Sequence, residues 1–542
     1  MIPSEEIIRK AIEEQVFVRQ GKERIVPETS QWLMDFRRVC LDPQFLDAYT
    51  EAFYERFKDD YPFQVGGAEV AAIPLVTAIV MKMREKGKLV NGFFIRKSRK
   101  KTGLLKMIEG KLTDDPIILI DDLINNGNTL DRQLKVITQA GKSVKAFFVV
   151  LRFRDTNAYK KYPEQGIRIE SLFNLNDFTE SLGTKLLEQT PLSEEVFSVS
   201  WYFKSEGAKL EQVIPKSGLV LDDKKVYMGT DRGMIVALDQ SDGKIVWKHQ
   251  IGLGTKEGKE IFSTPALHQG KLYFGAYDGN TYCVNAETGK RVWVSFEADW
   301  IQGSPVISGM RKTLYVPTVF GLQGKEGGVV ALDLDTGKSL WRTSLAPALR
   351  SAPIISEKEK ILFVGGEDGT LFALHIETGK VVWSFRSGGA IKDAPAYDEK
   401  FGMLIFSSFD GSIYALRADD GFLLWKYEVG LSNYSSPFIW EDKVYVASLD
   451  KHLYCLDLKD GTKKWSFPTR ARIFSSPRVY ADRLYLGSND ARLYEIDPHM
   501  GKQTGFFQAV ERITNPVIQG TDRGKIFLQT YANEIYCLKP RV

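Results

Sequence analysis

The sequence predicts two fold classes in one chain, an α/β domain followed by an all-β domain. Apolar runs typical of buried strands alternate with stretches of helical periodicity through residues 1–185. From residue 196 to residue 542, short strands and glycine-containing turns recur at a regular spacing. We therefore expect an α/β domain over 1–185, a linker over 186–195 and an all-β domain over 196–542.

The composition is that of a soluble globular protein. Of the 542 residues, 43% are hydrophobic and 26% are charged, which provides ample core. The net charge of +4 is too small to indicate nucleic-acid binding by itself. The chain start has no basic end and no apolar run, and no window approaches a membrane span, so we expect a cytoplasmic protein without membrane contact.

The cysteine pattern argues against a disulfide framework and against a zinc site. There is no Cys-x-x-Cys and no vicinal pair. We expect buried, reduced thiols at all four positions, which are Cys40, Cys283, Cys455 and Cys537.

Strands and helices alternate in order through the first domain. A capped helix is expected over 4–16, a strand over 31–38, and a helix with an aromatic face over 45–57. A strand, a glycine turn and a helix follow over 63–83, and then a short strand begins at Gly92. The last expected strands cover the apolar runs 144–152 and 167–173.

The segment 116–130 carries the chemistry of this domain. Its apolar run is typical of a strand buried on both faces of a parallel sheet, and we expect it to end at Asp121 and Asp122. A polar turn containing Gly127 follows, and a helix is expected from Thr129 to Ala140. Ligands of open α/β sheets bind at the carboxyl ends of the strands, and a helix start favours phosphate.

Two adjacent carboxylates before such a turn could accept hydrogen bonds from vicinal hydroxyls or hold Mg²⁺ through water. A phosphorylated ribose offers hydroxyls and phosphate at that separation. The alternative is a solvated Asp-Asp turn on an ordinary sheet. A second charged feature is the segment 96–106, whose six cations precede the first acid, Glu109. It favours an anion such as diphosphate, although many such runs are simply solvated loops.

The segment 116–130 resembles the ribose-phosphate motif of type I phosphoribosyltransferases. The resemblance implies that Asp121 and Asp122 face the ribose hydroxyls and that residues 125–129 cradle the 5′-phosphate. In the family this loop usually begins Thr-Thr or Thr-Ala, whereas here it begins Asn125-Asn126.

Four further segments, in the same order, resemble orotate phosphoribosyltransferases over about residues 5–185. They are the Asp35-Phe36-Arg37 triplet, the Gly67 turn, the basic loop 96–103 and the strand that ends near Arg152. By itself the triplet is better explained as a strand edge with an ion pair. The resemblance implies catalytic roles for Lys100, Asp121 and Asp122, and substrate contacts for Gly67, Ala68, Ala71, Ala72, Arg96, Lys97, Lys100, Asp121, Asp122, Asn125, Asn126, Gly127, Asn128, Thr129 and Arg152.

What the resemblance implies for function is phosphoribosyl transfer from phosphoribosyl pyrophosphate, with Mg²⁺, to a nucleobase, orotate first, in a homodimer. No metal ligand is assigned to the protein itself. The family's loop carries Asp-His where this chain has Lys101-Thr102. Two alternatives therefore stay open, a regulator that binds phosphoribosyl pyrophosphate without turnover and an interaction scaffold.

The second domain is expected to be an eight-bladed β-propeller. A unit of strand, Asp-Gly turn, aromatic strand, Thr-Gly-Lys turn and tryptophan recurs every 40 to 48 residues. Seven tryptophans mark the units, and Phe506 or Phe507 is expected at the eighth place. The last unit, 515–539, has three strands, and the strand 196–203 would complete it and close the ring.

These repeats resemble the pyrroloquinoline-quinone-type propeller repeat. The dehydrogenases with this repeat use a vicinal disulfide beside the quinone, which this sequence lacks, so no pyrroloquinoline quinone is expected. We expect a non-catalytic propeller that binds a protein partner or recognises a ligand.

Overall fold

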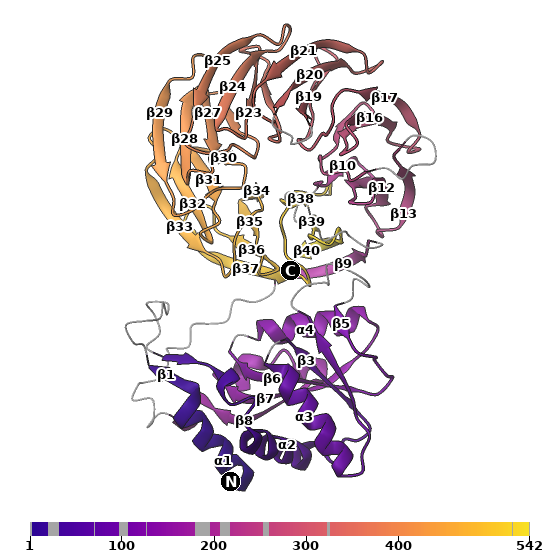
Figure 1. Cartoon of the computed structure of the whole chain (residues 1–542), viewed down its shortest axis with the longest axis vertical. Coiled ribbons are helices and arrows are strands. Elements are labelled where there is room, and N and C mark those ends of the chain that lie inside the picture. The colour runs from indigo at the N-terminus through magenta and orange to yellow at the C-terminus, as the bar shows by residue number, and fades with distance from the viewer. Residues whose placement is uncertain are drawn as a thin grey trace. The chain divides into compact units, whose positions relative to one another are not determined.

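A computed structural model describes residues 3–19, 32–69, 71–96, 107–125, 127–154, 156–178, 196–205, 217–252, 259–321, 326–522 and 524–540. The chain divides into two compact units, Met1–Leu192 and Ser193–Val542 (Figure 1). The first unit is α/β and the second is a propeller of eight blades, which confirms the predicted fold classes.

A six-stranded sheet in the order β5-β4-β3-β6-β7-β8 forms the centre of the first unit. Neighbouring strands from β4 to β8 are parallel, and only β5 is antiparallel to its neighbour. The strands are β3 (Gln64–Ala68), β4 (Asn91–Ile95), β5 (Ile108–Glu109), β6 (Ile117–Ile124), β7 (Val144–Arg152) and β8 (Arg168–Asn174).

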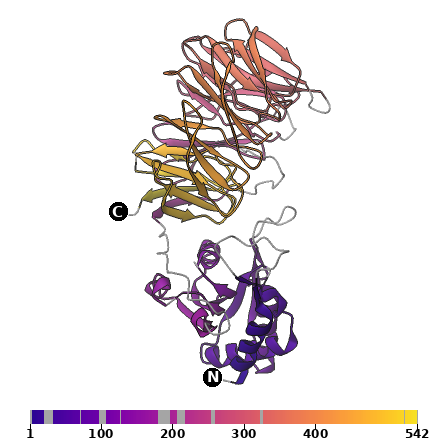
Figure 2. The same ribbon diagram turned by 90° about the vertical axis from the view of Figure 1, so that its left-hand side faces the viewer.

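Helices cover both faces of this sheet. Three of them, α1 (Pro3–Ala11), α2 (Pro43–Phe57) and α3 (Ala72–Glu85), share one core with the inward side chains of β3, β6 and β7. In Figure 2 these helices lie together in indigo. The ring of Phe148 on β7 lies 5.3 Å from Phe53 and 5.7 Å from Phe57 on α2, so aromatic packing joins helix to sheet. The helix α4 (Asn128–Gln139) contacts β3, β6 and β7 as well, but its residues are absent from that core.

Two element predictions in this unit are wrong in extent. The expected strand over 31–38 is only β2 (Trp32–Met34), which pairs with β1 (Phe17–Arg19), and a 3-10 helix (Phe36–Arg38) follows it. The first helix ends at Ala11 and continues as a π-helical turn (Ile12–Val16). Three short 3-10 helices, Thr156–Tyr159, Pro163–Gln165 and Leu175–Phe178, complete the unit.

The propeller consists of eight four-stranded antiparallel sheets arranged in a ring (Figure 1). The innermost strand of each blade is short, and the outermost strand carries a tryptophan in every blade except the seventh. The first four blades are β10 (Val220–Leu221), β11 (Lys225–Gly229), β12 (Met234–Asp239), β13 (Ile245–Gln250); β14 (Ala266–His268), β15 (Lys271–Gly275), β16 (Asn280–Asn285), β17 (Arg291–Phe296); β18 (Val306–Ser308), β19 (Thr313–Phe320), β20 (Glu326–Asp333), β21 (Ser339–Leu345); and β22 (Ile354–Ser356), β23 (Ile361–Gly365), β24 (Thr370–His375), β25 (Val381–Arg386).

The other four blades follow the same plan, and the last takes its outermost strand from the start of the unit. This strand, β9 (Phe197–Phe203), pairs antiparallel with β40, as predicted, and closes the ring. These blades are β26 (Ala396–Asp398), β27 (Met403–Ser407), β28 (Ser412–Arg417), β29 (Leu423–Glu428); β30 (Phe438–Trp440), β31 (Lys443–Ala447), β32 (His452–Asp457), β33 (Lys463–Pro468); β34 (Arg478–Tyr480), β35 (Arg483–Gly487), β36 (Arg492–Ile496), β37 (Gln503–Gln508); and β38 (Ile518–Gln519), β39 (Ile526–Gln529), β40 (Ile535–Pro540), β9.

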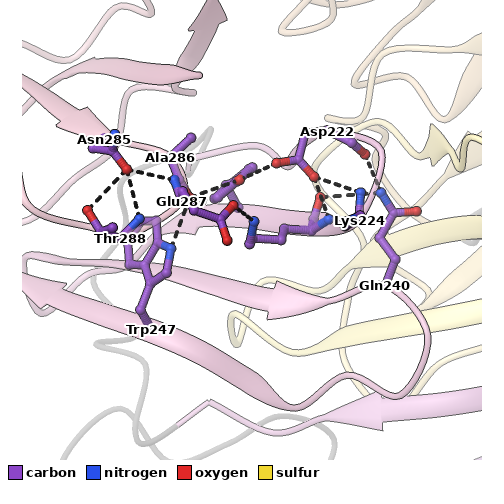
Figure 3. Close-up of polar contacts among 10 residues, drawn as sticks. Asp222, Lys224, Gln240, Trp247, Asn285, Ala286, Glu287 and Thr288 are labelled. Atoms are coloured by element: carbon purple, nitrogen blue, oxygen red, sulfur yellow. Dashed lines mark hydrogen bonds and ion pairs between the residues drawn. The ribbon is translucent and has the colours of Figure 1, made fainter. Parts of the chain in front are cut away.

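The tryptophans join neighbouring blades through the glycine turns. Figure 3 shows one joint, in which Trp247 Nε1 donates a hydrogen bond to the carbonyl of Ala286, at 3.0 Å. The same turn is held by Asn285 Oδ1, which accepts from the backbone N–H of Thr288 at 2.8 Å. The turn glycine, Gly289, has φ 68°, and a Cβ there would lie 2.5 Å from the indole of Trp247. Only glycine therefore satisfies both the turn and the contact.

The prediction that Phe506 or Phe507 takes the eighth tryptophan place is wrong by one position. Each tryptophan stands opposite a small residue on the neighbouring strand, as Trp465 stands opposite Cys455. In the seventh blade the equivalent residue is Gly505, which stands opposite Glu495. The side chain of Val196 packs against Gly505 and occupies the space of the missing ring.

Burial of the cysteines agrees with the sequence. All four are buried and free, which confirms the predicted thiols. Burial raises the pKa of Cys283 and of Cys455 to about 12. Among the described residues, no helix is long and apolar enough to cross a membrane.

Candidate functional site

The acid pair lies at the carboxyl end of the central strand. The prediction that β6 ends at the acids is wrong, because the strand continues through Asp121 and Asp122 to Ile124. Asp121 is buried, and its Oδ1 accepts a hydrogen bond from the backbone N–H of Asp122 at 3.0 Å. Its Oδ2 accepts a weak hydrogen bond from Gln133 Nε2 on α4, at 3.4 Å. The carboxylate of Asp121 is thus oriented from two sides.

The surroundings of Asp122 disfavour its charged form. Burial is the main cause that raises the pKa of its carboxyl group, and the nearby charge of Asp35 raises it further. Asp35 itself pairs with Arg37, with Nε 2.7 Å from Oδ1, and this hydrogen bond is the main cause that lowers the pKa of Asp35. The structure therefore brings the Asp35-Phe36-Arg37 triplet to the acid pair.

Cys40 is not a nucleophile at this site. Burial, followed by the negative charges of Asp122 and Asp121, raises the pKa of its thiol to about 12. A thiol with so high a pKa stays protonated at neutral pH.

The loop after the acid pair is held by two tyrosines. Gly127 adopts the left-handed conformation, with φ 73°, immediately before α4. Tyr162 Oη donates to the carbonyl of Gly127 at 3.0 Å, and Tyr159 Oη donates to the carbonyl of Asn125 at 2.8 Å. Because these carbonyls are engaged and the first N–H groups of a helix have no intrahelical partner, the loop can offer N–H groups to an anion. Thr129 is exposed in the first turn of α4.

Gly67 brings the backbone of β3 close to the central strand. The prediction that Gly67 lies in a turn after the strand is wrong, because β3 continues through Gly67 to Ala68. A Cβ on Gly67 would lie 2.5 Å from the carbonyl oxygen of Ile120 and 2.5 Å from Cβ of Ala72. Gly67 is also the register partner of Ile120, the residue before the acid pair. Ala68 is buried at the end of β3, and Ala71 immediately precedes α3. The predicted diphosphate turn and the acid pair therefore occupy the same edge of the sheet.

Two predicted arginines flank this edge. Arg96, which follows β4, lies 3.2 Å from Glu109 and 3.4 Å from Glu69, so its charge is shared with two carboxylates. Arg152 ends β7 and is the register partner of Ile124. Its Nε–H is buried and donates to no partner among the described residues. Such a buried donor is costly unless a further group approaches it.

Several predicted site residues lie outside the described residues, namely Lys97, Lys100, Lys101, Thr102 and Asn126. The side chain of Asn128 is not described either, although its backbone begins α4. The described part of the site therefore consists of the acid pair, the Gly127 turn, Gly67 at the end of β3 and the two arginines.

Sequence reasoning missed Gln133, Tyr159 and Tyr162. Gln133 lies one helical turn beyond Thr129, so helical spacing could have placed it near the loop. The tyrosines come from a segment more than thirty residues away, and no local pattern marks them.

Comparison with known proteins agrees with this geometry. The N-terminal region matches orotate phosphoribosyltransferases. The enzyme from Bradyrhizobium sp. (strain ORS 278) is 27% identical over 154 residues, which cover 28% of this chain and 83% of the relative. The enzyme from Pyrococcus furiosus is 25% identical over 188 residues, which cover 33% of this chain and 97% of the relative. The first unit is thus phosphoribosyltransferase-like.

The propeller matches two family descriptions. Residues 190–316 match the family of the outer membrane protein assembly factor BamB, and residues 323–541 match the β-propeller of the beta-alanine-activating enzyme. The structure of BamB from Moraxella catarrhalis superposes with a TM-score of 0.52 and 16% identity, over 64% of this chain and all of BamB. A europium-containing methanol dehydrogenase superposes with a TM-score of 0.53 and 14% identity, over 63% of this chain and 93% of its own. At these identities the likeness concerns the fold.

Proposed function

We propose that the first unit transfers the phosphoribosyl group of phosphoribosyl pyrophosphate to a nucleobase, with orotate as the first candidate. The observation that carries the proposal is the acid pair of β6 beside the left-handed Gly127 turn at the start of α4. A ribose 5-phosphate needs hydroxyl acceptors and N–H donors at adjacent places, and this edge of the sheet offers both. The likeness to orotate phosphoribosyltransferases supports the same reading.

Each residue of the site has a role in this proposal. The carboxylates of Asp121 and Asp122 accept hydrogen bonds from the ribose hydroxyls and stabilise positive charge that develops at C1 of the ribose. The N–H groups of residues 127–129 hold the 5′-phosphate. Gly67 and the segment that follows β3 hold the diphosphate together with Arg96, Lys97 and Lys100. The diphosphate leaves as a nitrogen of the base attacks C1.

Arg152 is the residue proposed to recognise the base. Its buried Nε has no partner among the described residues, and a carboxylate such as that of orotate would supply one. This assignment distinguishes an acidic base from a neutral base, because a neutral base would leave the guanidinium uncompensated.

The acid pair also fits Mg²⁺. Hard carboxylate oxygens are its preferred protein ligands, and it usually keeps waters and binds substrate phosphates together with one or two carboxylates. When bound, Mg²⁺ supplies positive charge beside the diphosphate. Hydrogen bonds fix the orientation of both carboxylates. Asp121 accepts from Gln133 and from the backbone of Asp122, and Asp122 Oδ1 accepts from the N–H of Leu123 at 2.8 Å.

Release of diphosphate from phosphoribosyl pyrophosphate and Mg²⁺ tests the proposal with a panel of bases. We expect release that depends on one base and that falls by about a hundredfold or more in Asp121→Asn/Asp122→Asn. The Arg152→Gln variant should lose activity toward an acidic base but keep any activity toward neutral bases. A panel in which no base causes release would rule out the transferase.

The second candidate is a regulator that binds phosphoribosyl pyrophosphate without turnover. The Lys101-Thr102 sequence favours it, because the family's Asp-His pair is missing from the basic loop. Saturable binding without release of diphosphate would support the regulator. No binding of phosphoribosyl pyrophosphate would instead favour the scaffold. Whether the first unit is a transferase or a regulator, we expect it to form a homodimer like that of the phosphoribosyltransferases and to be cytoplasmic.

A further inference from the structure

The axis of the propeller contains a cavity of about 300 Å³ lined by residues from all eight blades. Its wall is formed by the segments that precede the innermost strands, which lie nearest the centre of the ring (Figure 1). Equivalent positions in different blades can therefore be compared directly. Small polar side chains link neighbouring blades here, as where the N–H of Thr264 donates to Ser304 Oγ at 2.8 Å. A volume of this size is within the range of small-ligand sites.

Arg478 departs from the repeat. It is the first residue of β34, and the first residue of the innermost strand is Val220, Ala266 or Val306 in other blades. Burial lowers the pKa of its guanidinium group. In the described part of the chain this group forms no ion pair, and its one hydrogen bond runs from Nη1 to the carbonyl of Pro477 at 2.8 Å. The guanidinium is half-buried, and its Cζ lies 5.3 Å from the ring centroid of Phe438. The charge of Asp393 acts on it from a distance, so it still lacks a directly paired anion.

The other two cations of the cavity differ from Arg478. Arg350 Nη1 lies 3.2 Å from Glu367, and Lys392 Nζ lies 3.7 Å from the same carboxylate. Their charge is already compensated in part. An anionic ligand should therefore stabilise Arg478 more than it stabilises Arg350 or Lys392.

Asp393 is the second departure from the repeat. It precedes β26 at the position where serine stands in other blades, as Ser263 and Ser435 do. Burial raises the pKa of its carboxyl group. Among the described residues, both hydrogen bonds to this carboxylate end on Oδ1, from Ser436 Oγ at 2.7 Å and from the N–H of Ala394 at 2.9 Å. The backbone N–H of Ser436 also acts on this carboxyl group, which is half-buried and therefore accessible to a ligand in the cavity.

We propose that this cavity binds a small zwitterion of the amino-acid class, whose carboxylate pairs with Arg478 and whose ammonium group pairs with Asp393. Arg478 and Asp393 line the same cavity but form no ion pair with each other. Both side chains are half-buried, and each feels the charge of the other without a direct ion pair between them. Partial loss of hydration without a direct partner is unfavourable for both charges. A ligand with both charges satisfies the two together, whereas a simple carboxylate or amine satisfies only one. This site is independent of the transferase proposal.

Calorimetric titration of the full chain with α-, β- and γ-amino acids tests this inference. Acetate and a simple alkylamine serve as ligand controls with one charge each. The test variants are Arg478→Val and Asp393→Ser, which restore residues that other blades carry and which should therefore fold. We expect at least one amino acid to bind, and each variant to weaken this binding by about tenfold or more, as loss of a charged hydrogen bond predicts.

A matched control and the contradicting results complete the experiment. Lys426→Gln changes an exposed ion pair with Glu428 on the outer strand β29 and should leave binding unchanged. If Arg478→Val is unstable, Arg478→Gln is used instead, and if Asp393→Ser is unstable, Asp393→Asn is used instead. These variants should show the same loss of amino-acid binding. The inference is wrong if no amino acid binds, if binding survives in both variants, or if acetate binds as tightly as the amino acid.

Discussion

The acid pair of the first unit and the charged cavity of the propeller each contain a half-buried carboxylate, Asp122 in the first and Asp393 in the second. Asp122 lies on β6 of the α/β sheet, which has no repeated counterpart in the chain. Its role is therefore inferred from its place near the carboxyl end of a parallel strand. Asp393 belongs to a structure repeated eight times, so its role is inferred from its departure from the other blades. In a repeat fold, equivalent positions in the other blades serve as the comparison. A site that occurs once has no such positions and must be compared with designed variants.

We expect the largest loss of stability when a tryptophan that joins two blades is removed. Trp425 is buried, packs on Gly461 and donates to the carbonyl of Leu458 at 3.0 Å. Trp425→Ala should lower the free energy of unfolding of the propeller by about 4 kcal/mol. Chemical denaturation measures this loss, and Met310→Ala, which removes a side chain that is 82% exposed, should change it little. Equal losses in the two variants would contradict the inter-blade role of tryptophan.

The next effect concerns the single-copy site. In Gly67→Val the new side chain would overlap the carbonyl of Ile120 and Cβ of Ala72. We expect the first unit to lose about 3 kcal/mol of unfolding free energy while the propeller transition stays in place. Gly87→Ala is the control, because a Cβ there meets nothing within 4 Å, and its positive φ should cost only about 1 kcal/mol. An unchanged first transition in Gly67→Val would show that the packing of β3 against Ile120 and Ala72 is looser than these distances imply.

A smaller loss of stability should distinguish two tryptophans that occupy equivalent places in neighbouring blades. Trp465 Nε1 is buried and has no hydrogen-bond partner among the described residues, whereas Trp425 Nε1 has one. Trp425→Phe should therefore destabilise the propeller by about 1 kcal/mol more than Trp465→Phe. Denaturant titration of both variants measures the difference. A larger loss for Trp465→Phe would mean that its N–H has a partner after all.

The smallest effect is a gain in stability. The pKa of Asp122 is raised in the fold, so its ionisation costs stability once the pH is above the value for the unfolded chain, about 4. Asp122→Asn removes this cost, so the melting temperature of the first unit should rise at pH 7. The gain should shrink as the pH falls below about 4, where both states are protonated. Melting curves at both pH values test the sign, and a lower melting temperature at pH 7 would contradict it.

The sequence predicted most of the architecture because local patterns determine it. The apolar run before Asp121 predicted a central strand, and the spacing of tryptophans predicted the blades and the closing strand β9. What it could not predict depends on register and on distant contacts. Gly505 takes the eighth tryptophan place because strand pairing puts it opposite Glu495, and Tyr162 reaches Gly127 across thirty-five residues.

The measurement that tests the central claim most directly is calorimetric binding of phosphoribosyl pyrophosphate, with Mg²⁺, to the full chain. The wild type should bind with a single site per first unit. Asp121→Asn/Asp122→Asn should bind about a hundredfold more weakly, because the ribose hydroxyls lose both carboxylate acceptors. Equal affinity in the wild type and the double variant would contradict the claim that the acid pair of β6 holds the ribose.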